Sequence, residues 1–257
     1  MIIVFILLSL LLILIIFISH CLLNALFLIS KRPISYLYNK RKQEENYCEF
    51  NKLPYKTIDF VLALEDAHFF SHHGYDIDAI KNAYRRNIKA RKMIFGGSTI
   101  TQQLAKNLYF KFEPRISRKL SELLISIYIE KKLSKIEILE LYLNVIYYGN
   151  NQYGFYDASK YYFNKNYQDL TVNQSFFLIC LLSAPTVANP LVNPETFVRL
   201  RDKKLCQVLW IGEDKKYIDI IKGNDINSLD PELQKSNENI SKQVKMINEK
   251  YGLKVYK

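Results

Sequence analysis

Two glutamates flank a helix start that is rich in hydroxyl, amide and ammonium groups. Glu65 stands in the segment ALEDAHFFSHHG, and Glu122 stands in the segment RKLSELLISIYIE. Between them lies GGSTITQQLAKNLY, at positions 96–109. Carboxyl groups serve as general acids and bases, and a helix start beside glycines offers backbone N–H groups to an anion. The combination suits chemistry on a sugar that carries a phosphate.

The residues around Glu65 predict a buried helix over positions 57–71, because its sides are apolar nearly all round. Burial makes a lone carboxylate costly unless it is paired or protonated. It also favours the protonated form, as a general base or acid near neutral pH requires. The alternative is a structural glutamate held by an Arg or Lys from a neighbouring helix. If the helix lasts long enough, His72 shares the face of Glu65, and Gly74 can end the helix.

The middle segment predicts a loop that runs into a helix. Thr99 and Gln102 have the spacing of a capping box. The positive end of the helix dipole and the ammonium of Lys106, two turns further on, favour phosphate or pyrophosphate. The segment is not a Walker motif, since it lacks the Gly-Lys-Ser/Thr ending.

Arg118 and Lys119 precede Glu122 on a further predicted helix. Arg118 and Glu122 are four residues apart and share a helix face. The modest alternative is a surface ion pair worth less than about 1 kcal/mol.

The first thirty residues predict a membrane anchor. Positions 2–19 carry no charge, and the apolar character continues to Lys31-Arg32-Pro33. About 20 apolar residues span a bilayer as a helix. A cleaved signal peptide is the alternative, but its basic start and small-residue cleavage site are not evident. Lys and Arg follow the anchor and none precedes it, which alone favours a cytoplasmic C-terminal side. Long domains translocate largely regardless of charge, so the sidedness stays open.

The net charge of +11 favours anionic membrane surfaces or acidic ligands, and no nucleic-acid-binding motif is present. The four scattered cysteines contain no CxxC, which argues against a disulfide framework or a zinc site. Helical periodicity predicts a mainly α fold. Helices are expected over positions 57–71, 76–91, 98–110, 117–131, 134–146, 153–162, 171–183 and 196–210. The predicted organisation is an anchor (1–30), a juxtamembrane connector (31–52), a catalytic domain (53–210) and a polar tail (211–257).

Several ordered motifs resemble one family, the peptidoglycan glycosyltransferases (glycosyltransferase family 51) in their short monofunctional form. The first is Glu-Asp-x-x-Phe-x-x-His-x-Gly, and the second is Gly-Gly-Ser-Thr-Ile-Thr-Gln-Gln-Leu-x-Lys-Asn from position 96. The third is Arg-Lys-x-x-Glu from position 118, followed by Tyr-Leu-Asn from position 142. The resemblance covers about positions 53–205.

The resemblance implies a lysozyme-like α fold with a small membrane-associated lobe. It implies transfer of a lipid-linked glycan chain onto the 4-hydroxyl of lipid II, which forms β-1,4 linkages and releases undecaprenyl pyrophosphate. Glu65 would be the general base of this inverting reaction, and Glu122 would assist departure of the pyrophosphate. The substrate-binding residues would be Asp66, Phe69, His72, Gly97, Ser98, Thr99, Gln102, Gln103, Lys106, Asn107, Arg118 and Lys119.

The resemblance also sets expectations for cofactors and partners. No organic cofactor is expected, and Glu122 would assist departure of the pyrophosphate either directly or through a divalent cation (Mg or Mn). The partners would be lipid II, the lipid-linked nascent glycan, the bilayer and proteins of cell-wall synthesis or division, and not nucleic acid. The chain would be a single-pass protein of the bacterial inner membrane with its catalytic domain on the outer side. No Ser-x-x-Lys occurs, so acylation by β-lactams is not expected.

Two rival functions remain. A lysozyme-type hydrolase would also use two carboxyl groups, but a cationic pyrophosphate site has no purpose in it. An inactive scaffold of a cell-wall complex would account for the polar tail, but not for retention of both glutamates and the cations.

Overall fold

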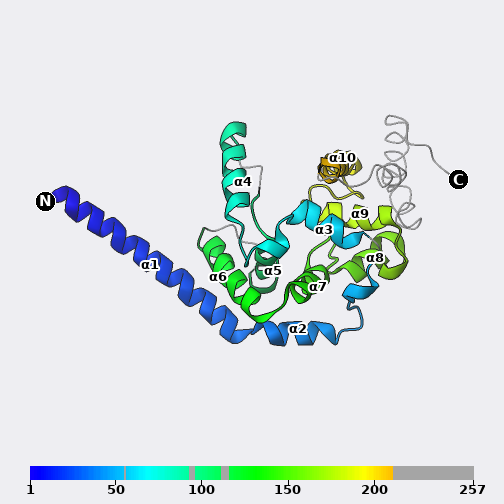
Figure 1. Ribbon diagram of the computed structural model, residues 1–257, viewed down its shortest axis with the longest axis horizontal. Coiled ribbons are helices and arrows are strands. Elements are labelled where there is room, and N and C mark those ends of the chain that lie inside the picture. The colour runs from blue at the N-terminus through cyan, green and yellow to red at the C-terminus, as the bar shows by residue number, and fades with distance from the viewer. Residues whose placement is uncertain (55, 93–95, 111–115, 211–257) are drawn as a thin grey trace. The chain divides into compact units, whose positions relative to one another are not determined.

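The computed structural model describes residues 1–54, 56–92, 96–110 and 116–210, which form two compact units (Figure 1). Within these ranges the chain is helical, and β pairing is limited to one isolated bridge between Tyr147 and Tyr153. The first unit comprises Met1–Gln43 and Phe70–Leu141, and the rest of the chain belongs to the second. The predicted mainly α fold is confirmed. The predicted polar tail lies outside the described residues.

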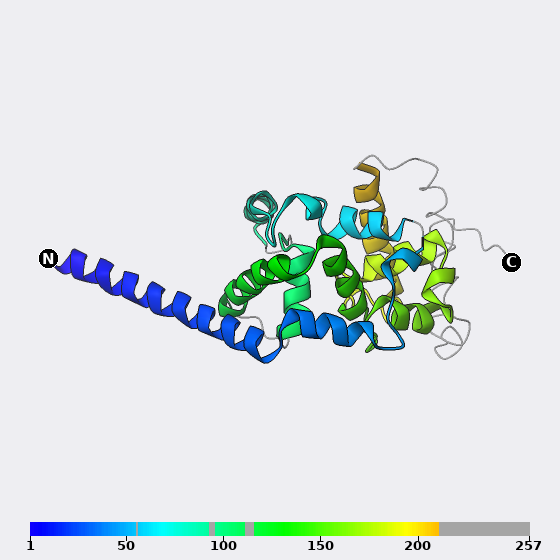
Figure 2. The same ribbon diagram turned by 60° about the horizontal axis from the view of Figure 1, so that its bottom comes forward.

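The first unit holds the membrane anchor and the helices of the second and third motifs. Its elements are α1 (Ile2–Lys31), α2 (Ile34–Lys42), α4 (Ile77–Ala90), α5 (Ile100–Tyr109), α6 (Ile116–Lys132) and most of α7 (Lys135–Val145). In both Figure 1 and Figure 2, α1 projects from the other helices of this unit toward the N-terminus.

Helix α1 is 30 residues long, about 45 Å at 1.5 Å per residue, and is the one described helix apolar enough to span a membrane. Its residues 2–20 are exposed, whereas Cys21 and Ala25 are buried against α6. The Ser121 hydroxyl donates a hydrogen bond to the Cys21 carbonyl oxygen at 3.2 Å. The last turns of the anchor are therefore part of the core of the first unit.

Helices α5 and α6 pack against each other and carry the residues of the predicted anion site. Ile100 and Leu104 of α5 are fully buried, as an amphipathic helix requires. A polar link ties the pair to α7: the Thr101 hydroxyl and the Lys135 ammonium both donate to Glu130 Oε1, at 2.6 Å and 2.8 Å. This buried link fixes α5 relative to α6.

The second unit is built around α9 (Val172–Leu181), whose residues from Gln174 onward are all buried. The other elements are η1 (Phe50–Lys52), α3 (Thr57–Glu65), α8 (Phe155–Phe163), η3 (Tyr167–Asp169) and α10 (Pro194–Trp210). Helices α3, α8 and α10 contact α9, and the Phe60 and Phe176 rings meet edge to face. Helix α9 is therefore the buried centre of the second unit.

Two sequence predictions need correction. The helix predicted over positions 57–71 ends at Glu65, because Asp66 adopts an extended backbone (φ −163°) and its N–H makes the last helical bond, to Leu62. The short 3-10 turn η2 (Phe69–Ser71) follows and buries Phe69 completely. The predicted connector contains helix α2, which forms because Ile34 and Tyr38, one turn apart, are both buried.

Candidate active site

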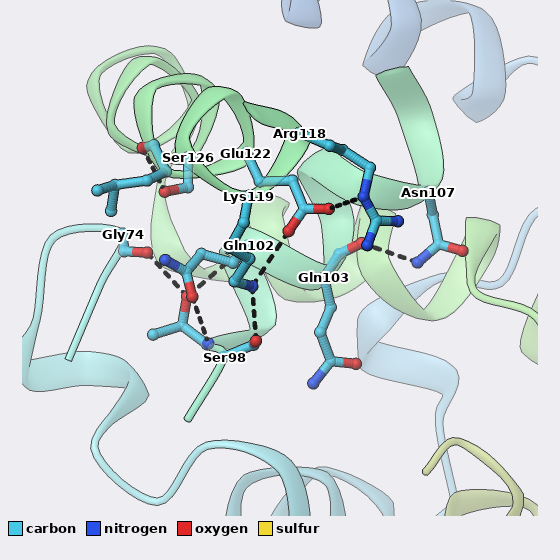
Figure 3. Close-up of polar contacts among 11 residues, drawn as sticks. Gly74, Ser98, Gln102, Gln103, Asn107, Arg118, Lys119, Glu122 and Ser126 are labelled. Carbon is cyan, nitrogen blue, oxygen red and sulfur yellow. Dashed lines mark hydrogen bonds and ion pairs between the residues drawn. The ribbon is translucent and has the colours of Figure 1, made fainter. Parts of the chain in front are cut away.

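The start of α5 is fixed by a complete capping box. The Thr99 hydroxyl accepts a hydrogen bond from the Gln102 N–H at 3.1 Å, and Gln102 Oε1 accepts one from the Thr99 N–H at 3.2 Å. The predicted cap is therefore confirmed. The same hydroxyl donates to the Gly74 carbonyl oxygen at 2.8 Å (Figure 3). Thr99 and Gln102 are almost fully buried, so their side chains are committed to shaping the loop.

Two glycines allow close approach of the backbones that form this loop. A Cβ atom on Gly97 would lie 2.9 Å from the backbone of Ala79 and Ile80 in α4. Gly74 has φ of +96°, in the left-handed region, and a Cβ there would lie 3.0 Å from the Ser126 backbone of α6. The glycines therefore bring α4, α6 and the start of α5 together within the first unit.

The first two turns of α6 place two cations and a carboxylate beside this loop (Figure 3). Lys119 Nζ donates to the Ser98 hydroxyl at 2.7 Å and lies 3.1 Å from Glu122 Oε2. Arg118 Nε lies 3.3 Å from Glu122 Oε1, although neither atom makes a hydrogen bond within the described residues. Glu122 is buried, whereas the Lys119 side chain is half exposed. The cations thus form the accessible side of the cluster.

A third cation, Lys106 of α5, lies near Arg118, Lys119 and Glu122. Burial lowers the pKa of the Lys106 ammonium, and repulsion by Arg118 and Lys119 lowers it further against the attraction of Glu122. A cation held near other cations is stabilised when an anion binds. Lys106, Arg118 and Lys119, here called the cation cluster, therefore favour a phosphate or pyrophosphate group at the start of α5 and α6. Gln103 and Asn107 lie on α5 beside Lys106, and Asn107 Nδ2 donates to the Gln103 carbonyl oxygen at 2.7 Å.

The residues at Glu122 do not fit a metal ion held by the protein. Among the described residues, no group of three or more His, Cys, Asp or Glu side chains is placed to hold one. Both Glu122 oxygens face the cations of Arg118 and Lys119, and a divalent ion there would be repelled. The Glu122 carboxylate therefore has protein cations, and not a metal ion, as its fitting partners.

Glu65 is the last residue of α3, and its carboxylate is paired. Lys204 Nζ of α10 lies 2.9 Å from Glu65 Oε1, and the two side chains are 7% and 8% exposed. A lysine from a neighbouring helix therefore holds the Glu65 carboxylate, and the catalytic role of Glu65 stays a prediction. A carboxylate at a helix C-terminus is disfavoured by the helix dipole, and the ammonium offsets this cost.

The other residues of the first motif have structural contacts. Asp66 is buried at the C-cap of α3, and Phe69 is fully buried in the turn that follows. His72 Nδ1 accepts a hydrogen bond from the Gly74 N–H at 3.2 Å and shapes the loop. Because α3 ends at Glu65, the helix that would place His72 on the face of Glu65 does not exist.

The predicted residues therefore fall into two groups. The first unit holds Gly97, Ser98, Lys106, Arg118, Lys119 and Glu122, together with His72 and the remaining residues of the second motif. Glu65, Asp66 and Phe69 belong to the second unit. Their roles toward a substrate stay predictions.

Sequence reasoning missed Lys204. The available signal was its position on a predicted helix, in step with the apolar residues Phe197 and Val208. A lysine on a buried helix face needs an acidic partner. The partner could not be chosen, because Glu65 lies 139 positions away in the chain.

Comparison with known proteins gives a consistent result. A family model described as "Transglycosylase" matches residues 30–209. Penicillin-binding protein 1F of Bacillus subtilis (strain 168) is 36% identical over 185 residues, which cover 72% of this chain and 25% of that protein. Penicillin-binding protein 4 of the same organism is 41% identical over 160 residues, covering 62% and 26%. Penicillin-binding protein 1A of Neisseria flavescens is 43% identical over 154 residues, covering 60% and 19%. The chain spans about a quarter or less of the length of these relatives.

Proposed function

Since the chain belongs to the transglycosylase family, we propose that this glycosyltransferase polymerises the glycan strands of peptidoglycan. The donor is the growing chain on undecaprenyl pyrophosphate, and the acceptor is lipid II. The observation that carries the proposal is the cation cluster beside a capped helix start, because a lipid-linked donor needs a site for its pyrophosphate.

The proposed reaction is a single displacement with inversion at the anomeric carbon. Glu65 takes the proton of the acceptor 4-hydroxyl, and that oxygen forms a bond to the anomeric carbon of the donor. The bond from this carbon to the pyrophosphate oxygen breaks, and its electron pair leaves with the pyrophosphate. A buried carboxylate suits proton transfer because water does not compete for it.

In this reaction the cation cluster stabilises the charge that develops on the leaving pyrophosphate. Lys106 and Lys119 extend from different helices, so they can bind different phosphate oxygens. Glu122 is assigned a supporting role: its buried carboxylate holds Arg118 and Lys119 in place. The neutral groups Ser98, Gln103 and Asn107 orient the phosphates through hydrogen bonds.

The surface of the first unit supports a membrane location for the reaction. Helix α4 exposes apolar side chains at helical spacing, namely Ile77, Ile80, Tyr84 and Ile88. Next to them it exposes the basic side chains Lys81, Arg85 and Lys89. An exposed apolar stripe beside a basic one is typical of helices in the membrane interface. Burial of Cys21 and Ala25 against α6 favours a retained anchor over a cleaved signal peptide.

The direct test is polymerisation of purified lipid II by the full chain in detergent, with products separated on a gel. Wild type is expected to form polymer, and Glu65→Gln to lose roughly a thousandfold in rate. Glu195→Gln is the matched control, because Glu195 is an exposed residue of the same unit that pairs only loosely with Arg199.

Three results would contradict this function. The first is a wild-type protein that makes no polymer under conditions where a known polymerase does. The second is release of soluble fragments from sacculi without lipid-linked substrate, which would indicate a hydrolase. Full rescue of a deletion strain by Glu65→Gln would indicate a scaffold.

The proposal places the catalytic part on the outer side of the cell membrane, where lipid II is presented. A cysteine introduced at Lys132, an exposed position at the end of α6, should react with a membrane-impermeant maleimide in intact cells. The parental protein, with its own four cysteines, is the control for background labelling. Labelling only after cell lysis would contradict the outward orientation.

A further inference from the structure

Helix α10 places the buried ammonium of Lys204 at the C-terminal end of α3. Lys204 lies on the face of α10 that packs against α3 and α9, and its side chain is 7% exposed. One turn further on, Gln207 Nε2 donates to the Ala63 carbonyl oxygen at 3.0 Å. The two contacts fix α10 to the last turn of α3, so the Lys204 ammonium has little freedom to leave Glu65.

The surroundings of Glu65 in the second unit make this cation important. Asp66, next along the chain, is a second buried acid. Burial raises the pKa of the Tyr142 and Tyr148 phenols well above the usual value, and the negative charge of Glu65 adds to this effect. Both phenols therefore remain neutral at physiological pH. The charges of Glu65 and Asp66 both act on the buried Tyr142 phenol, and the Lys204 ammonium lies 2.9 Å from Glu65 Oε1.

We propose that Lys204 is a positioning residue of the glycosyl transfer, which holds Glu65 ionised and oriented for proton abstraction. The proposal rests on the proposed function, in which Glu65 is the general base. It gives α10 a part in the reaction beyond packing. It also accounts for a charged lysine in a core position, which would otherwise be costly.

The proposal has a consequence that a merely structural pair would not have. A nearby positive charge favours the ionised form of a carboxyl group. Lys204 Nζ lies 2.9 Å from Glu65 Oε1, so its removal takes away the charge that favours the carboxylate form of the proposed base. The acidic limb of the pH–rate profile therefore moves to higher pH when the ammonium is removed.

The test compares Lys204→Met, Lys204→Arg and Lys203→Met in full-length protein. Lys203 precedes Lys204 on α10 and is exposed, so its substitution removes the same charge outside the core. Rates of lipid II polymerisation are measured from about pH 5 to pH 9. For Lys204→Met we expect the acidic limb to move up by about one pH unit or more. Lys204→Arg should restore the wild-type limb, and Lys203→Met should not change it.

A stability measurement keeps the test decisive if Lys204→Met folds poorly. Thermal unfolding of wild type, Glu65→Gln, Lys204→Gln and the double variant forms a cycle, and the losses should be less than additive if the pair exists. Additive losses would overturn the proposal. So would a folded Lys204→Met whose rate falls equally at every pH. A wild-type protein without activity would overturn the proposed function itself, and with it the positioning role of Lys204.

Discussion

The Lys119 ammonium donates a hydrogen bond to the Ser98 hydroxyl at 2.7 Å, and so joins the first turn of α6 to the loop before α5. The same nitrogen lies 3.1 Å from Glu122. Lys119 is thus held by a neutral group on one side and a buried carboxylate on the other, while half of its side chain remains exposed. This arrangement aims a preorganised cation at solvent, where an anionic ligand can reach it.

Lys119→Met should therefore reduce lipid II polymerisation by roughly tenfold to a hundredfold, because one preorganised donor to the leaving pyrophosphate is lost. Lys132→Met is the control, since it removes an exposed lysine from the other end of α6. Steady-state kinetics with purified protein measures the effect. Equal rates for the two variants would show that Lys119 does not act on the substrate.

Lys106→Met should lower activity and raise stability together. The lowered pKa of Lys106 means that its charged form costs stability in the fold, through burial and the nearby cations. This cost is fully present at neutral pH and is relieved as the pH rises through the folded pKa toward the unfolded value of 10.5. The variant should therefore have a higher Tm than wild type at pH 7, and the difference should shrink toward pH 10.

The Lys106→Met measurement also discriminates between function and packing. A lower Tm at neutral pH would show that the side chain contributes more by packing its methylene groups than it costs by its charge. A stabilised variant with unchanged polymerisation would remove Lys106 from the cation cluster.

Gly97→Ala should destabilise the protein, whereas Gly96→Ala should not. A Cβ on Gly97 would lie 2.9 Å from the α4 backbone, but one on Gly96 would have no atom within 4 Å. Forced separation of the loop from α4 should cost about 1–3 kcal/mol and displace the start of α5. Thermal unfolding and lipid II kinetics of the two variants check this. Similar losses of stability for both variants would show that the backbone conformation of the glycines matters, and not the close approach of Gly97 to α4.

Removal of divalent cations should change the polymerisation rate of wild type by less than about twofold. The reason is that the cations facing Glu122 are side chains of the protein. Polymerisation after treatment with a chelator, with and without added Mg²⁺, measures this. A loss restored by Mg²⁺ or Mn²⁺ would show that a metal ion binds with the substrate phosphates.

The predictions that held were those that depend on neighbouring positions in the chain. The capping box of Thr99 and Gln102 and the pairing of Arg118 with Glu122 follow from helical spacing. Helices α4 to α10 lie within two residues of their expected ends, because each is bounded by caps or breakers close by.

The features that sequence could not supply depend on distant residues. The pairing of Glu65 with Lys204 joins positions far apart in the chain, and no local pattern encodes it. The early end of α3 follows from the burial of Phe69, which periodicity assigned to a continuing helix. Helix α2 was missed because its polar composition gives no clear helical pattern. It is held by a distant contact, in which the Tyr38 hydroxyl donates to Glu140 Oε2 at 2.9 Å.

Packing of the last turns of α1 against α6 has a consequence for how the site meets its substrate. Cys21 and Ala25 sit in the same core as Ile125 and Ile129, so no flexible linker separates the anchor from the helix that carries Lys119. The height of Lys119 above the bilayer is then set by the fold, not by random motion of a tether. In the proposed reaction the pyrophosphate is carried on a polyprenyl chain in the headgroup layer, and a cation held at constant depth meets it without a search along the membrane normal.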